Sequence, residues 1–108
     1  MAAELKILMR LSCEQQGVII DTVSSLAGSG VEVRVYGSRL DKQLRGGDLD
    51  LILKSAEPLG YLVLAELKMT LEERLQLPVD IINCAASKKL SPFQSLALLQ
   101  SQPLSDVA

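Results

Sequence analysis

Two aspartates, Asp48 and Asp50, flank a single leucine at the start of the apolar run Leu51–Leu53. The pair Gly46-Gly47 precedes them, so the segment is predicted to be a strand that begins after a turn. Because side chains alternate along a strand, both carboxylates project to one side, with Cα atoms about 6–7 Å apart. At an effective dielectric of about 20, two like charges roughly 6 Å apart repel by nearly 3 kcal/mol. The arrangement therefore favours a bound cation, and oxygen ligands favour Mg²⁺ or Mn²⁺.

A third carboxylate, Asp80, lies in the second apolar run that could form a strand beside this one. Residues 77–82 are rich in β-branched side chains, and Pro78 stands where a strand tolerates proline. If the two strands pair, their backbones lie about 4.8 Å apart and Asp80 can reach the same centre. Three acids in a chain without histidine predict a hard-cation site for phosphoryl chemistry and disfavour zinc. The alternative role for Asp80 is a cap or a salt bridge.

The strand predicted over residues 31–36 ends at a turn suited to phosphate binding. Gly37 allows the backbone to approach a ligand closely, and Ser38 offers a hydroxyl and a backbone N–H at a predicted helix start. Arg39 follows directly, and we expect it to lie near phosphate. For Lys42 and Arg45, a phosphate contact and an ordinary surface position both remain open.

Composition excludes several classes of protein. The formal net charge is −2 and the pI is about 5.0, which argues against stable, nonspecific binding of nucleic acid. No apolar run approaches the ~18–20 residues of a membrane span, and no signal-peptide pattern is present, so we expect a cytoplasmic protein. Cys13 and Cys84 form no CxxC pair and have no histidine companion, so both are expected to be reduced packing residues.

The chain of 108 residues is predicted to be one domain, residues 1–108, of the α/β (α+β) class with a small mixed sheet packed by helices. A capping box at Ser12 starts a helix that ends near Gly28–Gly30. Pro58 is expected at the first position of a second helix, which runs through about Gln76. Other expectations are a helix from Ser91-Pro92 to about residue 100, a frayed tail over residues 104–108, and a core or interface role for Leu62, Leu64, Leu67 and Leu71.

Together, Gly37-Ser38, the gap of residues 39–47, Asp48-x-Asp50 and the later Asp80 resemble the DNA polymerase beta-like nucleotidyltransferase superfamily. The run GSRLDKQLRGGDLDL is similar to the minimal nucleotidyltransferase (MNT) proteins within it, and the resemblance covers roughly residues 9–84. It implies a palm-like fold and a magnesium-dependent enzyme that uses ATP. By the same resemblance, Asp48, Asp50 and Asp80 are the catalytic residues that hold two Mg²⁺ (or Mn²⁺) ions, whereas Gly37, Ser38 and Arg39 bind the nucleotide.

The resemblance also implies a partner. MNT proteins are typically paired with a helical HEPN protein, and an MNT antitoxin of this type adds AMP to a tyrosine of its HEPN toxin. One alternative is a nucleotidyltransferase that acts on a small-molecule hydroxyl such as that of an aminoglycoside. Another is a non-catalytic subunit that binds nucleotide and regulates its partner by contact, as part of a homo- or hetero-oligomer.

Overall fold

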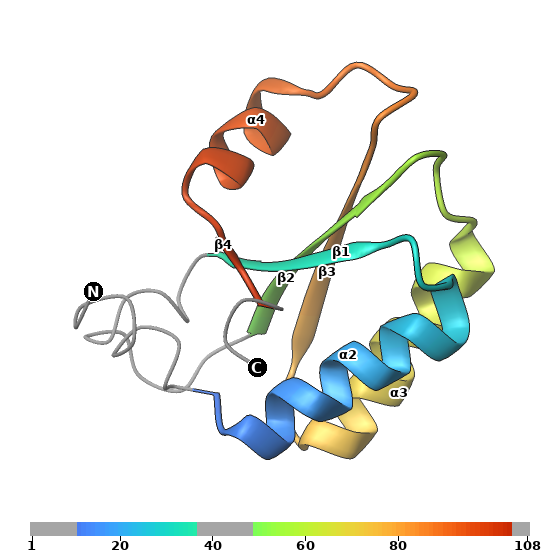
Figure 1. Cartoon of the computed structure of the whole chain (residues 1–108), viewed down its shortest axis with the longest axis vertical. Coiled ribbons are helices and arrows are strands. Elements are labelled where there is room, and N and C mark those ends of the chain that lie inside the picture. Colours follow the sequence, from blue (N-terminus) through green and yellow to red (C-terminus); the bar gives the residue numbers. More distant parts are fainter. Residues whose placement is uncertain (1–10, 37–48, 105–108) are drawn as a thin grey trace.

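The computed structural model describes residues 11–36 and 49–104, and they form an α+β arrangement (Figure 1). The predicted fold class is confirmed, because helices pack on a small mixed sheet. In chain order the elements are α2 (Cys13–Ala27), β1 (Glu32–Tyr36), β2 (Leu49–Ser55), α3 (Tyr61–Leu75), β3 (Val79–Ala85), α4 (Pro92–Leu99) and β4 (Gln102–Pro103).

The sheet has the strand order β3-β2-β1-β4. β1 pairs with β2 and β4 in antiparallel orientation, whereas β2 pairs with β3 in parallel orientation. The parallel connection needs a crossover, and α3 supplies it. Figure 1 shows α2 and α3 together on one face of the sheet and α4 on the other. Among the described elements, α2 and α3 therefore pack on one face of the sheet and α4 packs on the other.

Successive apolar side chains of β2 point alternately to the two faces of the sheet. Leu49, Leu51 and Leu53 are fully buried in the main core with the helix residues Ile19 and Leu67. The intervening Ile52 belongs to a smaller cluster beneath α4, together with Cys84, Ala97 and the partly buried Leu98. Because neighbouring strand residues point to opposite faces, β2 supplies apolar side chains to both layers.

Two capping boxes define helix starts as the sequence predicts. The Ser12 hydroxyl accepts the Gln15 N–H, and the Gln15 side chain accepts the Ser12 N–H. The same reciprocal pair joins Ser91 and Gln94 at the start of α4. Gly28 follows α2 with φ 97°, a backbone conformation that strains residues with a Cβ atom. The predicted end of α2 is thus confirmed.

The predicted start of α3 at Pro58 is wrong. The helix begins at Tyr61 after Gly60, which has extended φ and ψ of −71° and 160°. The Leu59 N–H donates to Asn83 Oδ1 at 2.8 Å, so the residues after Pro58 are tied to β3 and do not continue into the helix. The helix ends at Leu75, and Gln76 takes a left-handed conformation.

The expectation of a frayed tail beginning at residue 104 is also wrong. Leu104 is fully buried in the main core, and its N–H donates to the Val33 carbonyl at 2.9 Å. The two residues before it form β4 against β1. No sequence pattern predicts this strand, because two residues are too few to show alternation. Residues 1–10 and 105–108 lie outside the described part of the chain.

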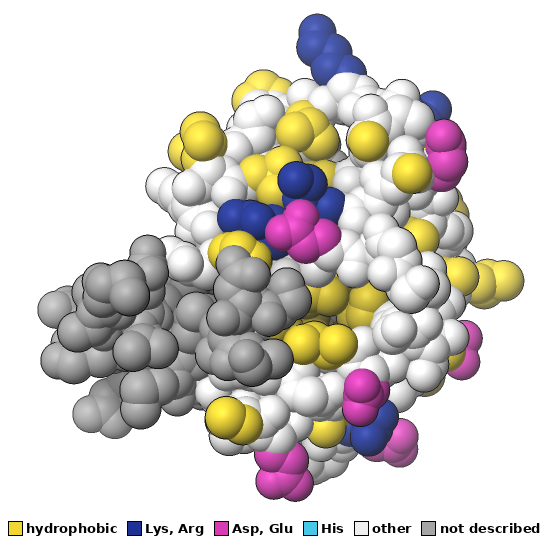
Figure 2. Space-filling view, viewed as in Figure 1, with side chains coloured by type: hydrophobic (Ala, Val, Ile, Leu, Met, Phe, Trp, Pro, Cys, Tyr) yellow, Lys and Arg dark blue, Asp and Glu magenta, His cyan; other side chains and the backbone are white. Residues whose placement is uncertain are grey.

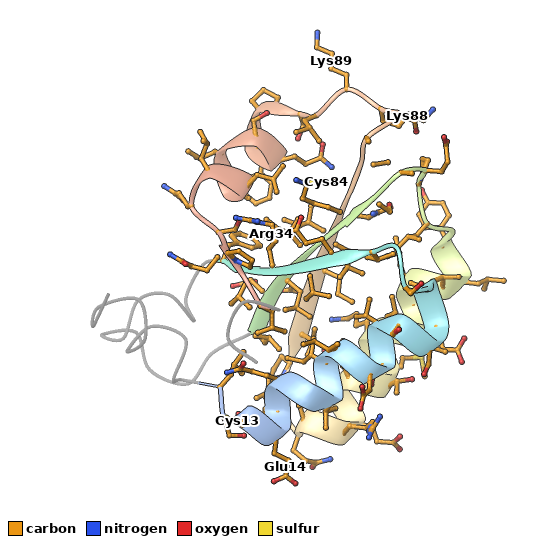
Figure 3. The ribbon with its side chains drawn as sticks, in the orientation of Figure 1. Cys13, Glu14, Arg34, Cys84, Lys88 and Lys89 are labelled. Carbon is orange, nitrogen blue, oxygen red and sulfur yellow. The ribbon has the colours of Figure 1, made fainter. Side chains whose placement is uncertain are left out.

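Two further expectations concern side-chain burial. Cys13 is exposed at the start of α2, so its predicted packing role is wrong, whereas Cys84 is buried and points toward α4 (Figure 3). Leu67 and Leu71 are fully buried, but Leu62 is exposed on the outer side of α3. No helix within residues 11–36 and 49–104 is long and apolar enough to cross a membrane.

Candidate functional site

Asp50 and Asp80 lie side by side on the central pair of strands. They are register partners on the parallel strands β2 and β3, whose backbones run about 4.8 Å apart. The residues before and after each of them are in the core beneath α2 and α3, so by alternation both carboxylates face the side of α4. The predicted pairing of these strands, on which the meeting of the two acids depended, is therefore confirmed.

Asp80 also has a basic neighbour that comes from the opposite side of the sheet. Lys68 Nζ on α3 lies 3.7 Å from Asp80 Oδ1 and 2.5 Å from the Val79 carbonyl oxygen. It also contacts Glu72 Oε2 at 2.9 Å, and that same oxygen accepts the Val79 N–H. Because β3 is an edge strand, the lysine can reach around it. The salt bridge that was the alternative role for Asp80 is thus present.

The charges of this network are held by hydrogen bonds. The bond to Glu72 is the largest cause of the raised pKa of Lys68, and Asp80 adds to it. The Val79 N–H is the largest cause of the lowered pKa of Glu72, followed by the bond from Lys68. The side chain of Asp80 remains 59% exposed beside Lys68, so the Asp80 carboxylate is accessible to a further ligand.

Tyr36 shares this face with the two acids. It is the antiparallel register partner of Asp50, and its ring meets the ring of Phe93 edge to face, with centroids 6.3 Å apart. Burial raises the pKa of the Tyr36 phenol, and the negative charges of Asp50 and then Asp80 raise it further. Tyr36 therefore packs against Phe93 and also lies within the electrostatic influence of both carboxylates.

The remaining predicted site residues, Gly37, Ser38, Arg39 and Asp48, lie outside the described residues, as do Lys42, Arg45 and Gly46-Gly47. The described strands still fix where this segment is attached. It leaves β1 after Tyr36 and enters β2 at Leu49, and Tyr36 pairs with Asp50. Both attachment points are thus at the end of the sheet that carries Asp50 and Asp80.

The donor set around Asp50 and Asp80 suits a hard divalent cation. Both ligands are carboxylates, and Mg²⁺ in proteins is commonly held by one or two carboxylates together with substrate phosphates and water. After burial, the negative charges of Asp50 and Asp80 are the next causes of the raised pKa of Tyr36. Within the described ranges no group of three acidic, cysteine or histidine side chains could hold a metal ion. A third protein ligand would have to come from elsewhere, and Asp48 is the predicted one.

Two basic residues near this face were not singled out in the sequence. Lys68 and Glu72 have the i, i+4 spacing of a helical ion pair, but nothing in the sequence indicates that Lys68 reaches Asp80. Arg34 projects between β1 and α4 (Figure 3). Its guanidinium donates to Glu32 at 2.9 Å and to the Ser101 hydroxyl at 2.5 Å. Arg34 therefore ties β1 to the α4–β4 connection.

Comparison with solved structures identifies proteins with this fold. A chain from a toxin–antitoxin crystal structure with AMP-PNP has a TM-score of 0.68 at 21% identity, covering 82% of this chain and 71% of that chain. A chain from the structure of a tri-AMPylated Shewanella oneidensis HEPN toxin in complex with MNT antitoxin has a TM-score of 0.65 at 17% identity, covering 84% and 69%. A mutant of the toxin–antitoxin MntA-HpeT gives 0.67 at 19% identity, covering 82% and 70%.

No protein-family model and no curated protein matches the sequence. The structural likeness therefore establishes the fold, and the expected nucleotidyltransferase-like fold class is confirmed. The fold of this chain is similar to that of chains in these toxin–antitoxin structures. The identities are only 14–21%, and a shared fold does not establish a shared activity. The activity of those proteins is therefore only proposed for this chain.

Proposed function

We propose that this chain is a nucleotidyltransferase of the MNT antitoxin type, which transfers AMP from ATP to a tyrosine of a HEPN-type partner. The observation that carries the proposal is the direct register pairing of Asp50 with Asp80 on the open face of the sheet. Two carboxylates at adjacent strand positions repel each other unless a cation or a basic group compensates. Their placement in this fold supports a metal-dependent site.

The solved structures support the nucleotide and the partner. One toxin–antitoxin pair was crystallised with the ATP analogue AMP-PNP, and in another the HEPN toxin is tri-AMPylated. Both share the fold of this chain. Transfer of AMP to a protein is therefore favoured over transfer to a small molecule.

In this proposal Asp50 and Asp80, together with Asp48, hold two Mg²⁺ ions. The ions would neutralise charge on the triphosphate and lower the pKa of the attacking hydroxyl. The acceptor oxygen forms a bond to the α-phosphorus, the bond between the α-phosphorus and the bridging oxygen breaks, and pyrophosphate leaves. Asp80 is the residue proposed to orient the acceptor and take its proton. Gly37, Ser38 and Arg39 are proposed to bind the triphosphate.

The test is an AMP-transfer assay with the product of the gene beside that of this chain, which we expect to be a HEPN-type protein. With α-labelled ATP and Mg²⁺ we expect label on the partner and, by mass spectrometry, added adenylate on a tyrosine. Asp50→Asn should abolish the label. Asp21→Asn is the matched control, because Asp21 is exposed on α2, which packs on the other face of the sheet.

Two outcomes would contradict the proposal. One is transfer that continues undiminished in EDTA, since the chemistry assigned to the acids requires a divalent cation. The other is labelling of an aminoglycoside or another small hydroxyl compound while the HEPN-type protein stays unlabelled. That result would favour the small-molecule alternative.

A further inference from the structure

The outer side of α3 carries large apolar side chains that contact nothing in the core. Leu62, in the first turn of α3, is 86% exposed, and Met69, in the middle of the helix, is 70% exposed, although the helix packs on the sheet. The buried residues of α3 are Leu67, Leu71 and Leu75. At 3.6 residues per turn, Leu62 and Met69 fall on the side directly opposite those three. The helix is therefore apolar on two sides, and only one of them is covered.

These exposed residues form one continuous surface, which we call the α3 outer face. It surrounds a shallow hollow of about 560 Å³ lined by Leu62, Ala65, Glu66, Met69, Thr70 and Glu73. From Leu62 to Glu73 the hollow follows three turns of helix, about 17 Å at 1.5 Å per residue. This length matches the footprint of one helix lying along another.

The charge of the α3 outer face is acidic. Glu66 and Glu73 line the hollow, and neither forms an ion pair with any residue of the described ranges. The lysine of this helix, Lys68, is engaged by Glu72 and Asp80. An occupant of the hollow would thus place its own charges beside two carboxylates that have no counter-ion among the described residues.

These charges select among occupants. In a two-fold contact between copies of this chain the same surface meets itself, so the unpaired glutamates of one copy would face those of the other. The net charge of −2 adds to that repulsion. A helix with an apolar seam and lysine or arginine beside it would cover Leu62 and Met69 and also compensate Glu66 and Glu73.

We propose that the α3 outer face docks an amphipathic helix with basic flanks, supplied by the HEPN-type partner. The identity of the partner rests on the proposed function. The surface lies on the side of α3 that is turned away from the sheet, whereas Asp50 and Asp80 are on the α4 side. Docking there anchors the partner without covering the face that carries the acids, where the tyrosine of another segment can approach.

The test compares matched leucine substitutions. In Leu62→Glu/Met69→Glu we expect the Kd for the HEPN-type protein, measured by titration calorimetry, to rise at least about tenfold. Leu99→Glu is the control, because Leu99 is 83% exposed on α4 and lies outside the α3 outer face. Both proteins should keep the circular dichroism and melting temperature of the parent, since each site is on the surface.

A second arm tests the charge. Glu66→Lys/Glu73→Lys should weaken binding, and Glu66→Gln/Glu73→Gln should reduce its dependence on salt. Glu57→Lys, at an exposed position before α3, is the control and should bind like the parent. If the Kd of Glu66→Gln/Glu73→Gln and the Kd of the parent depend equally on salt concentration, the occupant of the surface is not a basic helix.

The outcomes separate this proposal from the proposed function. If Leu62→Glu/Met69→Glu binds and is transfer-competent like the parent, the docking surface is wrong and the enzyme activity stands. If the parent neither binds nor labels the HEPN-type protein, both proposals fail. Light scattering that shows a dimer of this chain, lost in Leu62→Glu/Met69→Glu, would assign the surface to a second copy and overturn the proposal. A larger loss of affinity for the HEPN-type protein in Leu99→Glu than in Leu62→Glu/Met69→Glu would place the interface on α4 and overturn the proposal. Hydrophobic side chains of α4 are also at the surface (Figure 2).

Discussion

Lys68 and Asp80 form an ion pair of 3.7 Å across the edge of the sheet, although the lysine belongs to a helix that packs on the opposite face. The lysine also binds the Val79 carbonyl, so the start of β3 is held at both its backbone and its acidic side chain. Glu72 completes the arrangement by accepting the Val79 N–H. The position of Asp80 next to Asp50 thus depends on α3 as well as on strand pairing.

The variant Lys68→Met is expected to affect both stability and metal binding. Loss of the bond to Val79 should lower the free energy of unfolding by about 0.5–1.5 kcal/mol. Loss of the positive charge should lower the Mg²⁺ concentration needed for ATP to raise the melting temperature, because the ion no longer competes with an ammonium group. Thermal melts over a Mg²⁺ series check both effects. Lys88→Met is the control, since Lys88 lies in the loop before α4 (Figure 3), and an unchanged Mg²⁺ requirement in Lys68→Met would contradict the prediction.

Substitutions of the paired acids should separate chemistry from folding. Asp50→Asn and Asp80→Asn are expected to lower AMP transfer by roughly 10²–10⁴-fold, as for loss of a group that moves or positions a proton. Without metal, the free energy of unfolding should stay the same or rise by up to about 1 kcal/mol, because one repelling charge is removed and water screens the half-exposed Asp80. Transfer assays and urea unfolding in EDTA check the two effects. Unfolding of Asp50→Asn at room temperature would show that the pair is structural.

The alkaline titration of Tyr36 reports the charge of the site. Its pKa is raised above the ordinary 10.0 by burial, by Asp50 and by Asp80. In the unfolded chain the phenol ionises near pH 10, so stability from this group is complete below pH 10 and is lost as the pH rises through the folded-state pKa. Asp50→Asn should lower that pKa. Ultraviolet titration in a Tyr61→Phe background, which leaves Tyr36 as the single tyrosine of the chain, measures it; an unchanged titration would place the phenol away from Asp50.

The two cysteines should differ sharply in reactivity. Cys13 is exposed, whereas Cys84 is buried between the sheet and α4, and burial raises the pKa of the Cys84 thiol. Since the thiolate is the reactive form, one equivalent of a disulfide reagent should react quickly with the native chain and a second only on unfolding. Cys13→Ser should lack the fast phase. Two fast equivalents would mean that α4 detaches readily from the sheet.

Local patterns in the sequence predicted most of the elements that carry the site. The capping box at Ser12, the helix start at Ser91-Pro92 and the alternation before Tyr36 each depend on residues a few positions apart. This is the range over which a sequence signal is readable. The meeting of Asp50 and Asp80 required only that two apolar runs pair in register. The proximity of Asp50 and Asp80 was therefore predictable from the sequence.

The features that were missed depend on contacts between distant parts of the chain. The reach of Lys68 around β3 follows from that strand being at the sheet edge, which the sequence does not specify. Likewise, Leu59 binds Asn83, 24 residues away, and this contact delays the start of α3 beyond Pro58. The sequence also left a core role and an interface role open for Leu62, because which side of α3 meets the sheet depends on tertiary packing.

The last prediction concerns Leu104, which the sequence placed in a frayed tail. Its side chain is fully buried in the main core, and its backbone N–H bonds to Val33, so Leu104→Ala should lower the free energy of unfolding by about 2–5 kcal/mol. Pro103→Ala is the control, because Pro103 is only partly buried in β4 and loses less apolar area. Urea unfolding measures both variants. A loss below about 0.5 kcal/mol in Leu104→Ala would mean that the segment does not stay on β1 in solution, and that the original expectation of a loose tail was right.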